Sequence, residues 1–163
     1  ETMVQETFAM LESTAEAKGI QLRRELPERI APLHTDAGKL RQILINLVGN
    51  AIKFTEAGEV CVRVRTEPVT DRPISISVID TGIGIPAERQ QKVFDPFEQG
   101  DSSTRRQFGG TGLGLSIVKT FAGLIGARIA VESEVGRGTT FTLWFADPGV
   151  VATTVGSVQE AAG

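Results

Sequence analysis

The order of helical and strand-like patterns along the chain is the feature that most constrains its fold. Apolar residues recur at helical spacing over residues 1–18, 36–54 and 113–124. Between them lie short runs that alternate apolar and polar residues or are rich in β-branched residues, as is typical of strands. Helices that alternate with strands in a chain of 163 residues predict one α/β domain: a two-layer sandwich in which about three helices cover one face of a mixed, mostly antiparallel sheet. The predicted strands cover residues 20–26, 33–35, 59–67, 74–80, 128–133 and 139–145.

Charge and cysteine content exclude several classes of protein. The formal net charge is −3, and basic residues cluster only as the pairs Arg23 and Arg24, and Arg105 and Arg106, so we expect no nucleic acid partner. The single cysteine, Cys61, cannot form an internal disulfide and favours a cytoplasmic setting. No apolar run approaches the roughly 20 residues of a spanning helix. We therefore expect no membrane contact by this domain, and a membrane anchor in a longer parent protein stays open.

The predicted helix 36–54, which Asp36 can cap, has an apolar face for the sheet and a polar face that carries chemistry. Asn46 and Asn50 lie one turn apart in mid-helix, where asparagine is unfavourable, so an ordinary solvated face explains them poorly. Their neutral oxygens, with Lys53 a turn further on, suit a magnesium ion bound to phosphates. The apolar face comprises Leu40, Leu44, Leu47, Ala51 and Phe54, and the polar face comprises Lys39, Gln42, Asn46, Asn50 and Lys53.

Asp80 follows a run of β-branched residues and begins the segment DTGIGIP, residues 80–86. A turn aspartate is the plain alternative, because Asp-x-Gly is common in turns. A carboxylate held at the end of a buried strand can instead accept from the exocyclic amine of adenine, and it would repel the carbonyl of guanine. Gly82 and Gly84 would then let the backbone approach a bound nucleotide.

Residues 81–113 contain eight glycines or prolines and no sustained periodicity, which predicts a long functional or disordered loop. The end of this stretch, GGTGLGL (109–115), leads into a helix and suits an anion site built from backbone amides. Its spacing fits neither a P-loop nor a dinucleotide fingerprint. A glycine-rich loop by itself is weak evidence for a phosphate site. The polar residues 102–106, which precede this loop, are either hydrogen-bond donors to phosphates or a mobile polar loop.

Taken together, these segments resemble the ATP-binding catalytic domain of histidine kinases, whose Bergerat-type fold is shared with gyrase, an ATP-dependent heat-shock chaperone and mismatch-repair ATPases. The segment FDPFEQ, which resembles the family's phenylalanine box, and the form GGTGLGL favour histidine kinases over the other branches. The resemblance covers nearly all of residues 1–146, which we interpret as one domain followed by a disordered tail or linker, residues 147–163. The matching segments are NLVGNAIKFT (46–55), DTGIGIP (80–86), FDPFEQ (94–99), GGTGLGLSIVK (109–119) and VGRGTTFTLWF (135–145).

The resemblance implies a role for each matching position in binding ATP and Mg²⁺. Asn50 would be the magnesium ligand, while Asn46 and Lys53 would serve the phosphates. Asp80 would accept from the adenine amine, and Phe54 would pack against the base. Residues 95–109 would form a flexible lid, from which Arg105 or Arg106 would reach the γ-phosphate. The base pocket would include Gly82, Gly84 and, through water, Thr139; the phosphate side would include Gly110, Thr111, Gly112, Leu113 and Gly114.

The phosphoacceptor of such kinases is a histidine, followed by an acidic residue, on a separate dimerisation domain. The only histidine here, His34, is followed by Thr35 and does not match. We therefore expect this chain to bind ATP without phosphorylating itself, with two partners: the dimerisation domain of the same kinase and the receiver domain of a response regulator. Two other hypotheses stay open, a regulatory ATP-binding module without kinase activity and a conformational ATPase of the chaperone or mismatch-repair type.

Overall fold

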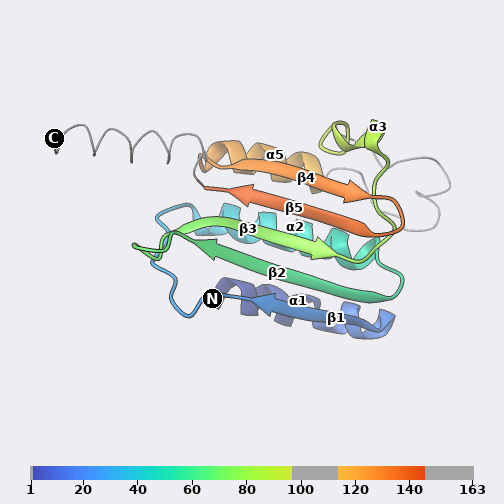
Figure 1. Ribbon diagram of the computed structural model, residues 1–163, viewed down its shortest axis with the longest axis horizontal. Coiled ribbons are helices and arrows are strands. Elements are labelled where there is room, and N and C mark those ends of the chain that lie inside the picture. Colours follow the sequence, from blue (N-terminus) through green and yellow to red (C-terminus); the bar gives the residue numbers. More distant parts are fainter. Residues whose placement is uncertain (1, 97–113, 146–163) are drawn as a thin grey trace.

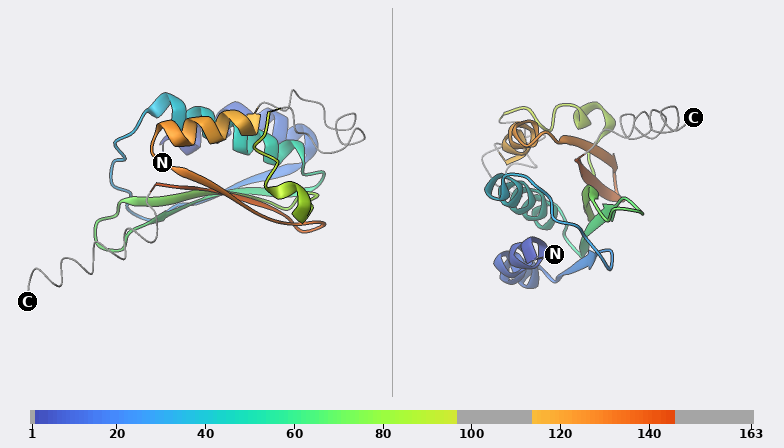
Figure 2. Two further views of the ribbon diagram at one scale, coloured as in Figure 1. Left: turned by 90° about the horizontal axis from the view of Figure 1, so that it is seen from above. Right: turned by 90° about the vertical axis from the view of Figure 1, so that its left-hand side faces the viewer.

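The computed structural model describes residues 2–96 and 114–145. One layer is a five-stranded sheet, and three long helices lie against one of its faces (Figures 1 and 2). The predicted two-layer α/β sandwich is thus confirmed. The long helices are α1 (Thr2–Lys18), α2 (Ala37–Lys53) and α5 (Gly114–Leu124), and the strands are β1 (Ile20–Glu25), β2 (Gly58–Thr66), β3 (Pro73–Asp80), β4 (Arg128–Glu134) and β5 (Gly138–Trp144).

The sheet is mixed and mostly antiparallel, as predicted. Its strand order is β1-β2-β3-β5-β4; β1 pairs with β2 in parallel, and the other three pairings are antiparallel. The register places Asp80, at the end of β3, between Val60 on β2 and Thr139 on β5. The carboxylate predicted to select a base therefore lies in the middle strand of the sheet.

The central helix α2 is held at both ends by polar contacts. Asp36 caps its start, since its carboxylate accepts from the backbone amide of Lys39 at 3.0 Å. At the other end, the ammonium group of Lys18 donates to the carbonyls of Ile52 (2.7 Å) and Lys53 (3.0 Å), in the last turn of the helix. These contacts fix where α2 ends, and hence where its polar face meets the loops.

The apolar face of α2 packs on the sheet as its periodicity predicts. Leu44 and Leu47 are each only 1% exposed and join a core that includes Val78 and Leu143. Burying a leucine of this kind contributes about 1.5–3 kcal/mol. Phe54, which was expected on the same face, is only half-buried because it lies just beyond the helix end.

Two sequence predictions differ from the structure. Residues 33–35 do not form a strand. Just before this segment, the amide of Ala31 donates to the carbonyl of Asp71 at 2.8 Å, and Pro32 has no amide hydrogen to donate to a ladder. The predicted continuous loop after Asp80 is interrupted by a short helix, α3 (Ala87–Gln90).

Several predicted features lie outside the described residues. They are most of the predicted lid, the arginines Arg105 and Arg106, residues 109–113 of the segment GGTGLGLSIVK, and the predicted tail from residue 147. Among the helices of the described ranges, none is long and apolar enough to cross a membrane.

Candidate functional site

Asp80 is buried and held by backbone donors. It is the last residue of β3 and only 8% exposed. Its Oδ1 accepts from the amide of Gly82 at 2.9 Å and from the amide of Thr139 at 3.2 Å. Within residues 2–96 and 114–145, no hydrogen bond or ion pair reaches the other oxygen, Oδ2. The carboxylate is therefore fixed in direction through one of its two oxygens.

Burial raises the pKa of the Asp80 carboxyl above its ordinary value, because removal from water disfavours the charged form. The amides of Gly82 and Thr139 act in the opposite direction, and their effect is the smaller one. A buried carboxylate of this kind gains from any ligand that donates a hydrogen bond to Oδ2.

Four glycines let neighbouring backbone come close to the segment that follows Asp80. A β-carbon on Gly138, whose φ is +124°, would lie 2.0 Å from the carbonyl oxygen of Asp80. One on Gly82 would lie 2.5 Å from the carbonyl oxygen of Phe54, and one on Gly84 would lie 2.3 Å from that of Glu134. One on Gly58 would lie 2.1 Å from the Thr81 hydroxyl. Sequence reasoning missed Gly58 and Gly138, although a glycine at the first position of a strand is a signal for close backbone approach.

The protein's own packing therefore accounts for Gly82 and Gly84. Their predicted approach to a nucleotide stays a prediction, because no ligand is needed to explain either residue.

A hydrogen-bond network fastens the loop after Asp80 to the β4–β5 hairpin. The Ser133 hydroxyl accepts from the amide of Ile85 at 2.7 Å and lies 2.9 Å from the Gly138 carbonyl and 2.8 Å from the Thr139 hydroxyl. The side-chain amide of Gln90 donates to the carbonyls of Ile85 (3.0 Å) and Ser133 (2.9 Å). The network orients the strand whose amide holds Asp80. Neither Ser133 nor Gln90 carries a local sequence signal for this role.

The polar face of α2 meets the start of α5. The Gln42 side chain donates to Asn46 Oδ1 at 3.2 Å, and Asn46 Nδ2 donates to the Gly114 carbonyl at 3.4 Å. A β-carbon on Gly114 would come within 3.7 Å of the side-chain nitrogen of Asn50. The structure thus brings together Asn46, Asn50 and Gly114, which the sequence analysis assigned to one phosphate-binding region from two distant segments.

Lys53 and Phe54 connect this polar face to the surroundings of Asp80. Burial lowers the pKa of the Lys53 ammonium group, which lies 5.4 Å from the centre of the Phe54 ring. The carbonyl of Phe54 accepts from the amide of Ile83 at 3.1 Å. The end of α2 and the loop after Asp80 are therefore directly joined by a backbone hydrogen bond, and the Asp80 carboxylate and the two asparagines belong to one region of the molecule.

The donor set of this region fits a magnesium ion only together with a ligand. Among the residues described, no three His, Cys, Asp or Glu side chains gather in a way that could hold a metal. Asn46 and Asn50 offer neutral oxygens on a half-buried helix face. Mg²⁺ commonly takes one or two protein oxygens and completes its octahedron with water and phosphate, which is the arrangement that this set allows.

The sequence matches the family model described as "Histidine kinase-, DNA gyrase B-, and HSP90-like ATPase" over residues 35–149. Among curated proteins, it is 41% identical to the sensor histidine kinase AruS of Pseudomonas aeruginosa, over 99% of this chain and 16% of that protein. It is 48% identical to the circadian input-output histidine kinase CikA of Synechococcus elongatus, over 85% of this chain and 18% of that protein. The chain thus spans less than a fifth of the length of these relatives.

Solved structures agree with these matches. Full-length ShkA in complex with AMPPNP superposes with a TM-score of 0.76 at 32% identity, over 87% of this chain and 28% of that one. The nucleotide-free catalytic domain of histidine kinase ThkA superposes with a TM-score of 0.70 at 27% identity, over 87% of this chain and 90% of that one. The buried Asp80, the helix α2 with Asn46 and Asn50, and these matches lead to one conclusion: the chain belongs to the histidine kinase-, DNA gyrase B- and HSP90-like ATPase family, and within it to the catalytic domains of histidine kinases.

Proposed function

We propose that this domain binds Mg-ATP and presents the γ-phosphoryl group to a histidine on a separate dimerisation domain. The observation that carries the proposal is the Asp80 carboxylate, which is buried and fixed through Oδ1 by two backbone amides. The backbone hydrogen bond from Ile83 to Phe54 joins the loop after Asp80 to α2, the helix with the two asparagines. The carboxylate proposed to accept from the base thus lies next to the helix face proposed to bind the phosphates. AMPPNP in full-length ShkA supports the proposal from a related protein.

Selection of adenine follows from the free oxygen of Asp80. Adenine presents an amine where guanine presents a carbonyl, so Oδ2 can accept a hydrogen bond from the first and is repelled by the second. Leaving a buried carboxylate unpaired against guanine adds a further cost. Phe54, half-buried at the end of α2, would supply an apolar surface for the base.

The triphosphate would lie along the polar face of α2 and the start of α5. Asn50 would contribute an oxygen to the metal, Asn46 would support the phosphates, and Lys53 would offset their charge. Mg²⁺, when bound there, would supply charge neutralisation on the phosphate oxygens. Thr139 would help at the base, Gly110, Thr111, Gly112 and Leu113 would line the phosphate side, and Arg105 or Arg106 would reach the γ-phosphate from the predicted lid.

Phosphoryl transfer requires mainly that the reactants are positioned and that charge is neutralised. In the proposed reaction, the acceptor imidazole nitrogen forms a bond to the γ-phosphorus as the bond to the β,γ-bridging oxygen breaks, which leaves ADP and phosphohistidine. The phosphohistidine would then serve an aspartate of a response regulator. A solved complex of histidine kinase ThkA with the response regulator TrrA supports such a partner.

A transfer experiment in trans tests the proposal. This chain, mixed with a separately purified dimerisation domain of its parent protein and ATP labelled at the γ-phosphate, is expected to place the label on the histidine of that domain. The same mixture with the histidine replaced by glutamine is the control. Docking of the two domains without any label transfer would contradict kinase activity while leaving ATP binding intact, as expected of a purely regulatory module. ATP turnover by this chain alone, with ATP-driven dimerisation, would favour a conformational ATPase.

Replacing Asn50 by alanine is expected to remove most of the magnesium dependence of nucleotide affinity, because the side-chain oxygen proposed for the metal is lost. Calorimetry of ADP binding with Mg²⁺ and with EDTA measures this dependence. Arg41→Ala is the matched control, since Arg41 lies on the same helix but is exposed and pairs with Glu6. An Asn50→Ala protein that keeps its magnesium dependence would show that the metal assignment is wrong.

A further inference from the structure

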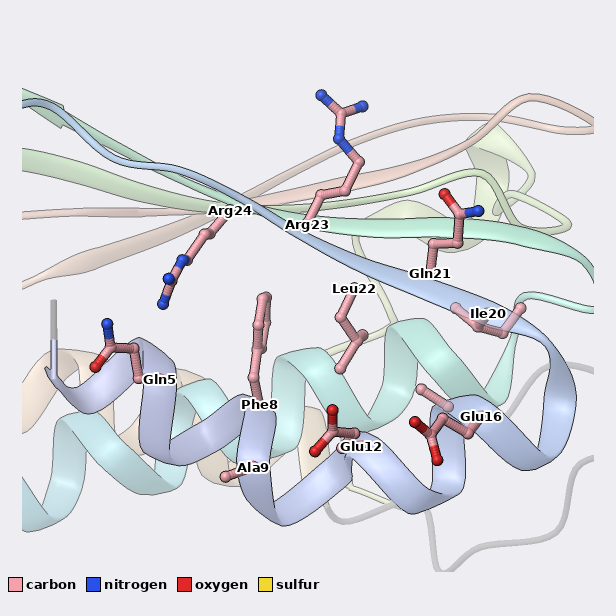
Figure 3. A pocket seen from close by; sticks show the side chains of 11 residues that line it. Gln5, Phe8, Ala9, Glu12, Glu16, Ile20, Gln21, Leu22, Arg23 and Arg24 are labelled. Atoms are coloured by element: carbon pink, nitrogen blue, oxygen red, sulfur yellow. The ribbon is translucent and has the colours of Figure 1, made fainter.

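A groove runs along the free edge of the sheet. β1 pairs with β2 on one side, and no described strand lies on its other side. Between β1 and α1 is a groove of about 550 Å³, whose apolar wall includes the side chains of Phe8, Ile20 and Leu22 (Figure 3). A strand edge with unpaired backbone groups beside an apolar surface is a template for another strand.

The charges along this groove are separated by sign. Glu16 on α1 lies toward the Ile20 end and Glu12 lies beneath Leu22, whereas Arg24 lies at the other end, above Gln5 (Figure 3). None of the ion pairs formed within the described part of the chain includes these three charged residues. By contrast, Arg23 points to the opposite face of the sheet and pairs with Glu25 and Glu59. The groove therefore has one acidic and one basic end, both without partners among the described residues.

We propose that this groove is an interface between two copies of the chain, in which the two β1 strands pair antiparallel about a two-fold axis at Leu22. In that register Ile20 of one copy lies opposite Arg24 of the second copy, and side chains directly opposite each other share a face. The helices of both copies then remain on the same side of one continuous sheet. A shift by one residue would place them on opposite sides.

The same register makes the charges complementary. The acidic end of each groove meets the basic end of the other, so Arg24 of each copy pairs with Glu16 of the second copy. A two-fold interface forms each contact twice, as such isologous contacts require. Ala9, a small exposed residue on the groove side of α1, leaves room for the two α1 helices to lie beside each other. A peptide of a single charge would match only one end, which is why a second copy fits this groove better.

Charge reversal tests the interface on the complete chain by sedimentation velocity over a range of concentrations. The unaltered protein is expected to show a reversible monomer–dimer equilibrium. Arg24→Glu places two acidic pairs at the interface, and Glu16→Arg places two basic pairs there. Each variant alone is expected to dimerise at least roughly tenfold more weakly. An equimolar mixture of the two is expected to dimerise again, because both pairs are of opposite charge in the mixed dimer.

Arg65→Glu is the matched control, because Arg65 is exposed on β2 and takes part in none of the ion pairs among described residues. This variant is expected to dimerise as the unaltered protein does. Amide hydrogen exchange of the unaltered protein adds a measurement without substitutions: exchange in β1 should slow as concentration rises. A monomer at every concentration, dimerisation of Arg24→Glu at full strength, or a mixture that stays monomeric would each overturn the proposal. None of these results depends on nucleotide binding.

Discussion

Replacing Asp80 by asparagine is expected to weaken Mg-ATP binding by roughly 10- to 100-fold and to remove most of the preference for ATP over GTP. The substitution keeps the shape of the side chain, and the asparagine oxygen can still accept from the amides of Gly82 and Thr139. At the position of Oδ2, however, an NH₂ group would face the adenine amine. A hydrogen bond to a charged acceptor is worth about 1.5–3 kcal/mol, which corresponds to about one to two orders of magnitude in affinity.

Calorimetric titration with Mg-ATP and Mg-GTP measures both expectations. Asp71→Asn is a suitable control, since Asp71 lies in the turn between β2 and β3 with φ +57°, a conformation that asparagine tolerates well. Its contacts to Glu67 and Ala31 use backbone atoms and are kept in that variant. If Asp80→Asn retained the full preference for ATP, the adenine contact proposed here would be wrong.

The same variant should be more stable than the unaltered protein when no nucleotide is present. Because burial raises the pKa of Asp80 in the folded state, ionisation costs folding free energy as pH rises from the ordinary carboxyl value of 3.8 through the raised value. Asparagine does not ionise, so the melting-temperature difference in favour of Asp80→Asn should grow between acidic and neutral pH. Thermal unfolding of both proteins over this pH range measures the difference. A pH-independent difference would contradict the raised pKa.

Replacing Gly138 by alanine is expected to lower the free energy of unfolding by roughly 3 kcal/mol or more. The backbone at Gly138 has φ +124°, which alanine adopts only with strain, and the added methyl group would lie 2.0 Å from the carbonyl oxygen of Asp80. Relief of that contact requires β5 to move away from β3. Since the Thr139 amide holds Asp80, the variant should also lose nucleotide affinity.

Urea unfolding followed by circular dichroism measures this cost. Gly136→Ala is a closely matched control, because it lies in the same hairpin with φ +83°, and a β-carbon there would have no neighbour within 4 Å. It should cost only about 1–2 kcal/mol, the penalty of the left-handed conformation alone. Equal losses in the two variants would show that the close approach to Asp80 is not what requires glycine at position 138.

Features that depend on neighbours within a turn or two were predictable from the sequence. The apolar spacing of Leu40, Leu44 and Leu47 identified α2 and the face it buries, and Asp36 was recognised as its cap. The prediction of a strand at residues 33–35 was wrong because a strand depends on a partner that is distant in the sequence. A strand needs a partner edge, and a short apolar run does not reveal whether one is available.

The residues of the candidate site also fall into those that local sequence reveals and those that only distant contacts reveal. Asp80, Asn46 and Asn50 stood out because their types are unusual at the end of a buried strand or in mid-helix, and such conflicts are visible in local sequence. Ser133, Gln90 and Gly138 did not stand out, since their importance arises only when the β3–β5 register brings residue 139 opposite residue 80. Periodicity and helix capping depend on residues that are close together in the sequence. Contacts between segments about 60 residues apart depend on how the strands pair, and only the folded chain decides that pairing.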